Sequence, residues 1–272
     1  MKQIRNTSLH FLSVFLMLCS LYISTSFNAL MANSLKNTEV ESQFLKLQKS
    51  IISGLSTADS REKSFKKVEN IISALDDKQS QYYWLARIEF ERARLLDVNQ
   101  EATADLFENS QQLVKKSLKL GKFSDGYRLL SDTYMHQMSY RGVLYQIANG
   151  GKLASLPLKA LELNPQNVSA KISYALFLIN APSFAGGDVK KAIRELQTVS
   201  QSNNPMDQFW GYYFLAEAFN KIENYQKAYQ AIEKSLTIFP NNLSAQKKEQ
   251  ALSKQVKQVK QVFSVVQKGS LS

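Results

Sequence analysis

Residues 212–240 read YYFLAEAFNKIENYQKAYQAIEKSLTIFP, and parts of this stretch recur upstream as YYWLARIEFERARLL and LVKKSLKLGKF. Small residues stand at Ala216, Ala228 and Ser235, where two antiparallel helices would approach closely, and larger residues fill the space beside them. Pro240 then ends the second helix. The stretch therefore predicts a helical hairpin that is repeated along the chain.

A second phrase closes three predicted second helices: Lys, then Ser or Ala, then Leu, any residue and an aliphatic one. It stands at 116–120 as KSLKL, at 159–163 as KALEL and at 234–238 as KSLTI, and Pro165 follows the second copy as Pro240 follows the third. Counted back from Pro240 in a frame of 34 residues, the pattern resembles the tetratricopeptide repeat (TPR) family. The resemblance implies an all-α fold, an α-solenoid of TPR-like helical hairpins, whose concave groove binds protein partners.

The composition also favours helices. The 272 residues include only 10 glycines and 5 prolines, and 44% are apolar, as in a globular chain. We divide the chain into a signal peptide at 1–32, a degenerate N-terminal hairpin at 33–78, TPR-like repeats at 79–242, and a C-terminal capping helix with a tail at 243–272. The predicted helices span about 36–54, 59–75, 79–97, 101–120, 124–147, 152–163, 167–180, 188–202, 206–221, 225–238 and 242–267.

Local residues predict where the repeats depart from the frame. Gly150 and Gly151 are expected to end a long helix, and Pro157 to kink the next one or delay its start. The insertion NAPSFAGG at 180–187 predicts an extended loop, after which Asp188 caps the following helix. The last helix carries one apolar stripe that should cover the final hairpin, formed by Leu252, Val256, Val259, Phe263 and Val266.

The N-terminal residues predict export. MKQIRN is basic, and FLSVFLMLCSLYI at 11–23 is an apolar core that is short for a membrane span. Small residues at Ser24 and Ser26 suit cleavage, and Ala32 offers a second site. An uncleaved anchor and lipidation at Cys19 are alternatives, although Leu18 is larger than lipidation signals favour. We therefore expect an exported protein, periplasmic or secreted, and membrane-anchored if the signal is retained.

The sequence offers few groups for catalysis. Cys19 is the sole cysteine, so a processed chain has no thiol for disulfides, metal sites or nucleophilic attack. His136 is then its only histidine, which excludes sites built on paired histidines. Asp132 could pair with His136 on one helix face, but nothing places a nucleophile nearby, so we interpret His136 as a surface or groove residue. We predict no enzyme, no cofactor and no metal site.

The chain is basic, with a formal net charge of +11. A basic exported protein can meet anionic lipid, acidic polymers or nucleic acid. No stretch resembles a nucleic-acid-binding motif, because Tyr and Lys interleave at the spacing of the helical repeat. We therefore expect a protein partner and no nucleic acid, and we leave open a weak contact with an anionic membrane and a homo-oligomer.

The resemblance also implies a set of groove residues, since positions 2, 5, 9 and 12 of each first helix line the groove in TPR proteins. One TPR subgroup clamps a C-terminal carboxylate with Lys at position 5 and Asn at position 9. No repeat here has that pair, so chaperone-tail recognition is not expected. Position 5 holds Tyr83, Arg128, Ile172 and Tyr213; position 9 holds Arg87, Asp132, Leu176 and Glu217; and position 12 holds Phe90, Met135, Ile179 and Asn220.

Three aliphatic residues, Ile172, Leu176 and Ile179, would lie on this water-facing surface, and such apolar surface usually marks a contact site. Alternatively, the long helix around Tyr140 and Tyr145 folds over and buries them. The predicted function is that of a non-enzymatic exported scaffold for protein–protein interaction. Two alternatives stay open: an accessory component of an envelope solute transporter, similar to exported TPR proteins that work beside TRAP-type systems, and a small-ligand pocket beneath the insertion at 136–151.

Overall fold

The computed structural model describes residues 34–95 and 100–269, and all regular elements within these ranges are helices. The predicted signal peptide lies outside them. No helix of the described ranges is long and apolar enough to cross a membrane. The elements are an N-terminal helix at 34–52, α2 (Ala58–Ser73), α3 (Lys78–Leu95), α4 (Gln100–Leu120), α5 (Ser124–Gln137), α6 (Val143–Leu163), α7 (Val168–Asn180), the 3₁₀ turn η1 (Ser183–Ala185), α8 (Val189–Ser200), α9 (Pro205–Lys221), α10 (Tyr225–Ile238) and α11 (Leu243–Gly269).

Polar side chains fix where several of these helices begin. Thr57, Asn167 and Asn224 each accept a hydrogen bond from a backbone N–H in the first turn of the helix that follows. Asp188 does the same for α8, as predicted, with its Oδ1 2.9 Å from the backbone nitrogen of Lys191. Each cap satisfies a backbone donor that the start of a helix leaves unpaired.

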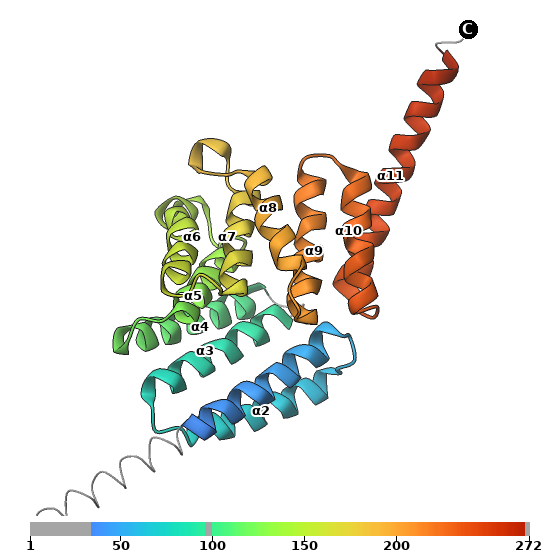
Figure 1. The fold of residues 1–272 in the computed structure, drawn as a ribbon. Coiled ribbons are helices and arrows are strands. Elements are labelled where there is room, and N and C mark those ends of the chain that lie inside the picture. The colour runs from blue at the N-terminus through green and yellow to red at the C-terminus, as the bar shows by residue number, and fades with distance from the viewer. Residues whose placement is uncertain (1–33, 96–99, 270–272) are drawn as a thin grey trace, which may run out of the picture.

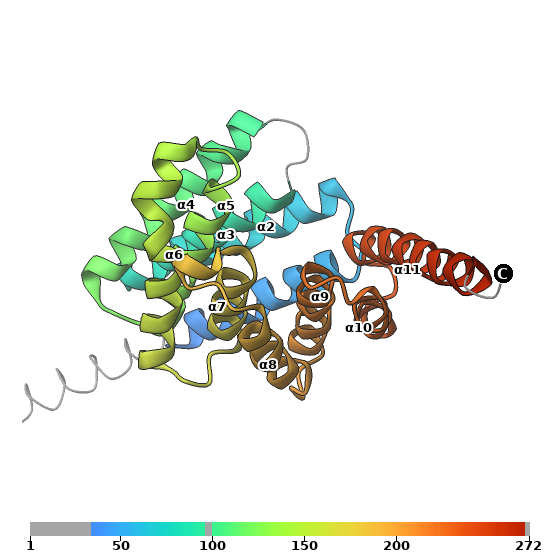
Figure 2. The same ribbon diagram turned by 90° about the horizontal axis from the view of Figure 1, so that it is seen from above.

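The helices pair into hairpins that stack side by side (Figures 1 and 2). The N-terminal helix pairs with α2, α3 with α4, α5 with α6, α7 with α8, and α9 with α10. First helices of successive hairpins also contact one another, α3 with α5, α5 with α7 and α7 with α9, and we call the surface that they share the inner face. Finally, α11 packs against α10. The predicted all-α solenoid of helical hairpins is confirmed.

The small residues that define the repeat lie at the tight contacts of the C-terminal half. Ala216, Ala228 and Ser235 are fully buried. Phe209 and Ile232, also fully buried, belong to the same hydrophobic core. Small side chains thus let the helices approach while large ones fill the remaining space.

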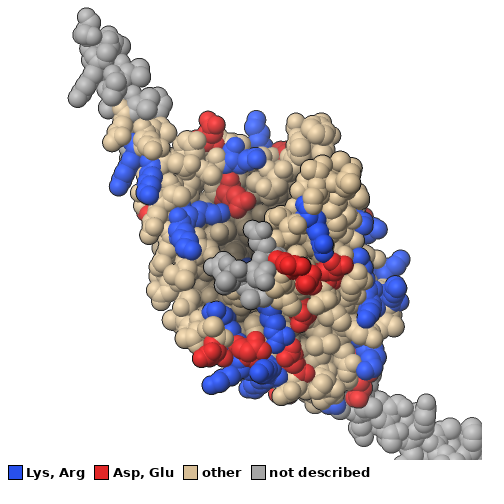
Figure 3. Space-filling view, turned by 180° about the vertical axis from the view of Figure 1, so that it is seen from behind, with Lys and Arg blue, Asp and Glu red and all other residues tan. Residues whose placement is uncertain are grey.

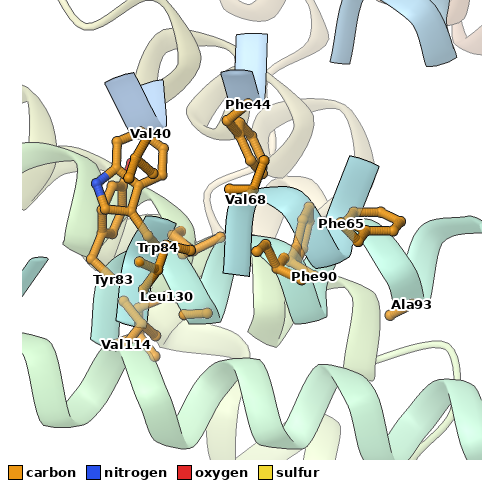
Figure 4. Packing of buried hydrophobic residues seen from close by; sticks show 14 of the residues in the cluster. Val40, Phe44, Phe65, Val68, Tyr83, Trp84, Phe90, Ala93, Val114 and Leu130 are labelled. Atoms are coloured by element: carbon orange, nitrogen blue, oxygen red, sulfur yellow. The ribbon is translucent and has the colours of Figure 1, made fainter. Parts of the chain in front are cut away.

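The N-terminal half has a core of its own (Figure 4). Phe44 of the N-terminal helix packs against Trp84 of α3, with ring centroids 5.7 Å apart. Arg92 of α3 adds salt bridges to Glu62 and Glu69 of α2, at 3.1 and 2.5 Å. The N-terminal hairpin is therefore joined to the repeats by apolar packing and by charge.

The boundary between α5 and α6 differs from the prediction. The sequence predicts a helix at 124–147 that Gly150 and Gly151 end, but α5 is shorter, and α6 begins at Val143 and runs through both glycines. Pro157 also lies inside α6 and does not delay its start. The expectation that Gly150 and Gly151 end a helix was therefore wrong, and so was the delayed start at Pro157.

Packing on either side of the glycines explains the difference. Tyr145 and Leu153 of α6 pack against the core, and the Tyr145 hydroxyl donates a hydrogen bond to Gln137. Each glycine costs a helix about 1 kcal/mol relative to alanine, which these contacts outweigh. A β-carbon at Gly150 or Gly151 would meet no atom within 4 Å, so neither glycine serves a close approach.

Only the first half of α11 lies against the body of the protein. Ala245 and Leu252 are buried in the core, so this half caps the last hairpin as predicted. Val256 and Val259 are half-buried, and beyond them the helix projects away from the stack (Figures 1 and 2). The side chains at 263 and 266, which complete the predicted stripe, lie outside the described part of the chain.

The first and last hairpins meet, which the sequence did not predict. Ile52, at the end of the N-terminal helix, belongs to the same core as Phe209. The Nδ2 of Asn242 donates a 2.7 Å hydrogen bond to the carbonyl oxygen of Ile52. The Oδ1 of Asn242 accepts a hydrogen bond from the backbone N–H of Ala245, so one amide both joins the two ends and caps α11.

Gly54 completes this contact, which we call the seam (Ile52, Gly54, Asn241 and Asn242). Its φ of +69° is one that residues with a side chain rarely adopt. A β-carbon at Gly54 would come within 2.1 Å of the carbonyl oxygen of Asn241. Only glycine fits at this position. The absence of a side chain lets the first and last hairpins come into direct contact, and the solenoid closes on itself.

Candidate binding face

The predicted groove residues all belong to α3, α5, α7 and α9, the helices whose contacts form the inner face. They differ in how much of each residue is exposed to solvent. Four are buried: Tyr83, Phe90, Arg128 and Ile179. Eight are half-buried: Arg87, Asp132, Met135, Ile172, Leu176, Tyr213, Glu217 and Asn220.

Core packing accounts for Tyr83 and Phe90, the two predicted groove residues of α3 that are buried. Tyr83 lies edge-on to Phe123, with ring centroids 5.2 Å apart, and Phe90 lies edge-on to Phe107 at 5.5 Å. Both belong to the core that includes Phe44 of the N-terminal helix. At α3, therefore, large side chains that the repeat frame assigns to the groove help to hold the N-terminal half together.

Arg87 ties the N-terminal helix to the inner face. Its guanidinium lies 4.1 Å from the ring centroid of Phe44, a cation–π contact, and donates a 3.3 Å hydrogen bond to Gln48. Gln48 in turn donates to Glu91 at 2.9 Å. Through these contacts Arg87 joins α3 to the N-terminal helix.

Arg128 and Asp132 form an ion pair one turn apart on α5, with side chains that are 10% and 18% exposed. Arg128 Nη1 lies 2.9 Å from Asp132 Oδ2, and Ser173 of α7 donates to Asp132 Oδ1 at 2.5 Å. Burial raises the pKa of Asp132, against the opposing effects of Arg128 and Ser173. Burial alone would lower the pKa of Arg128, but the Asp132 carboxylate outweighs it, so that pKa stays above its usual value. The pair links α5 to α7 in the middle of the inner face.

His136 is a packing residue and does not pair with Asp132. Its ring stacks on Phe107 with centroids 4.7 Å apart, and Phe90 meets it edge-on at 5.2 Å. Burial, together with the positive charge of Arg94, lowers the pKa of His136 to about 3. The carboxylate that could have oriented the imidazole for acid–base chemistry is bound to Arg128 and Ser173 instead.

We expect His136→Phe to make the protein less sensitive to acid. A folded-state pKa of about 3 lies below the ordinary value of 6.5, so the unfolded chain takes up the proton first, and stability is lost as pH falls below 6.5 toward 3. Between pH 7 and pH 5 the wild type should lose about 2 kcal/mol more than the variant. Urea denaturation at the two pH values measures this, and equal losses would show that His136 titrates normally.

Three residues that the sequence analysis did not single out also lie around the inner face. Arg94 of α3 lies over the Trp210 ring of α9 at 5.6 Å. Lys248 of α11 lies 4.0 Å from the Tyr213 ring centroid and forms a 3.0 Å salt bridge with Glu217. Trp210 occupies position 2 of the last repeat, a groove position, so the repeat frame could have found it. Arg94 and Lys248 lie outside the frame's groove positions, so only the structure could identify them as neighbours of this face.

The aliphatic residues of α7 are mostly packed. Ile179 is 1% exposed, and Ile172 packs against the same core. Leu176 is half-buried. Tyr145 packs against the other core, beside Tyr134, but Leu153 and Ala154 of the same helix pack against the core that contains Ile179. The continuous apolar patch considered from the sequence is therefore reduced to the partly exposed Leu176 and Ile172.

Viewed from behind, the molecule is hollowed near its centre, with basic and acidic side chains around the opening (Figure 3). A separate open hollow of about 520 Å³ lies between α8, α9 and α10, with Tyr212, Phe219 and Lys234 in its lining. Within the described ranges, no three His, Cys, Asp or Glu side chains come together in a way that could hold a metal ion.

Comparison with protein-family models finds no match for the chain, and comparison with curated proteins finds none either. Among solved structures, the chain is similar to YrrB, described as a TPR protein with an unusual peptide-binding site, at 16% identity over 70% of this chain and 86% of that one, with a TM-score of 0.42. It is also similar to TTC0263, a thermophilic TPR protein of Thermus thermophilus, at 18% identity over 71% and 89%, with a TM-score of 0.48. At these values the similarity concerns the fold alone.

Proposed function

We propose that the protein is an exported, non-enzymatic scaffold that binds a segment of another protein on its inner face. The observation that carries the proposal is a group formed by the half-buried Trp210 and Tyr213 and the exposed Arg94. Trp210 and Tyr213 lie edge-on with centroids 5.5 Å apart, and Arg94 reaches over Trp210 from the opposite hairpin. Trp, Tyr and Arg are the residues that most often dominate the energy of protein interfaces.

The non-enzymatic part of the proposal rests on the use made of the titratable groups. The histidine of the inner face is packed between aromatic rings, and the carboxylate of Asp132, one turn before it on α5, is held by Arg128 and Ser173. No nucleophile is aligned with a base among the contacts of this face. Binding of a protein segment needs neither an aligned nucleophile nor a base.

Two adjacent tyrosines of α9 allow a matched test. Tyr213 lies on the inner face, whereas Tyr212 lines the hollow between α8, α9 and α10. Tyr213→Ala should weaken binding of the partner by about 1–3 kcal/mol, and Tyr212→Ala should leave it nearly unchanged. The partner is first identified by cross-linking and co-purification from the cell envelope, and its affinity is then measured by calorimetry. Equal affinities for both variants would contradict an inner-face site.

Export is supported by the basic start and apolar core of residues 1–23. N-terminal sequencing of the protein from envelope and culture fractions should give a chain that begins between Phe27 and Leu35. An intact Met1 in the membrane fraction would instead mean a retained anchor. Co-purification with a membrane solute transporter would instead identify the alternative accessory role.

A further inference from the structure

We propose that the projecting half of α11 pairs antiparallel with the same helix of a second copy, which makes the protein a dimer. The proposal starts from the apolar positions Leu252, Val256, Val259, Phe263 and Val266, which follow one another at intervals of four, three, four and three residues. An average interval of 3.5 residues is the spacing of a helix that winds around another helix.

The stripe is too narrow for a membrane surface. Lys254, Lys257 and Gln258, which lie on the opposite side of the helix from the stripe, are exposed. A helix that lies in a lipid interface carries a broad apolar face, whereas a seam with one apolar residue every three or four positions fits another helix. The lysines at 254 and 257 also lie away from the stripe, so two copies can meet without bringing these charges together.

The body of the same chain covers only the beginning of this stripe. Leu252 is 2% exposed, but Val256 and Val259 are half-buried, and the helix continues to Gly269 away from the stack (Figures 1 and 2). Helices held by tertiary contacts normally direct their apolar side toward a partner. A helix of this length that leaves its own body has its partner outside that body.

A hollow beside α11 favours the antiparallel arrangement. It measures about 360 Å³ and is lined by Ile222 and Tyr225 from the α9–α10 hairpin and by Val256 and Val259 from α11. Ile222 is 45% exposed there. In an antiparallel pair centred near 259, the second helix runs along the first toward the body of the protein and covers this hollow. A two-fold axis then repeats the same contact on the other copy, which closes the assembly at two.

Sedimentation of the full chain as purified should show a monomer–dimer equilibrium in the micromolar range. Val259→Asp should weaken the dimer at least about tenfold, since it buries a charge in place of an apolar side chain. Gln258→Asp, one residue away on the exposed side, is the matched control and should leave the dimer intact. Because Val259 is only half-buried, both variants should melt with the wild type, so a loss of dimer does not reflect unfolding.

A cross-link gives a second readout. In a Cys19→Ser background, Val259→Cys should form a disulfide between two copies under mild oxidation, while Gln258→Cys should not. A chain that stays monomeric at all concentrations, a dimer that survives Val259→Asp, or equal cross-linking at 258 and 259 would each overturn the proposal. The test leaves Trp210 and Tyr213 untouched, so its failure would not bear on partner binding at the inner face.

Discussion

Arg128→Met is expected to destabilise the fold by about 3–5 kcal/mol, because it leaves the Asp132 carboxylate buried without its counter-ion. Arg128 is 8% exposed, and its closest charged partner, at 2.9 Å, is Asp132. Urea denaturation at pH 7 measures the change. The expectation also means that Arg128, although predicted as a groove residue, is a poor probe of partner binding, since its removal disturbs the fold.

The double variant Arg128→Met, Asp132→Leu is the control. Replacing both members of a buried ion pair with apolar side chains is often neutral, so most of the lost stability should return. Ser173 keeps a hydrogen bond to the Ser169 carbonyl in either case. The single variant should also recover as pH falls, because a carboxyl with a raised pKa takes up its proton more readily in the folded state. A single variant as stable as the double at pH 7 would show that the pair contributes nothing.

Gly54→Ala should cost about 2–4 kcal/mol, through the positive φ and the clash with the Asn241 carbonyl at the seam. Neither atom of the clash belongs to a flexible side chain, so the backbone itself must move. Hydrogen exchange should show the loss at the start of α11 and at the end of the N-terminal helix, while α5 and α6 stay protected.

Gly150→Ala is the matched control for Gly54→Ala. A β-carbon at Gly150 meets nothing, and alanine is the better helix former, so this variant should gain up to about 1 kcal/mol. The same substitution should therefore have opposite signs at two glycines of one chain. Destabilisation of similar size at both positions would mean that the close contact at the seam is not formed in solution.

The fold was predictable because its signal is local and repeated. Ala216, Ala228 and Ser235 mark helix contacts within one hairpin, and the same spacing returns in other copies. Helix starts were predictable where a capping side chain such as Asp188 is present. The break between α5 and α6 was not, because there the packing of Tyr145 and Leu153 outweighs the weak helix preference of two glycines.

The inner face was predictable only in outline. The repeat frame placed Tyr213 and Glu217 on it, but it could not tell that Tyr83 and Phe90 serve the core, since that depends on the hairpin packed beside them. Arg94 reaches Trp210 across the closed end of the stack. Such a contact joins residues far apart in the sequence and leaves no periodic pattern.

The seam also changes how the chain should fold. An open solenoid can lose its end hairpins one at a time, because each contacts only its neighbours. Here the hydrogen bond between Ile52 and Asn242 joins residues 190 positions apart, so both ends are held by the same contact. Forming it requires the closure of a very long loop, which slows folding. Once this contact is formed, neither the first nor the last hairpin can unfold by itself. The array should therefore unfold in one cooperative step, whereas an open array of equal length would unfold in several.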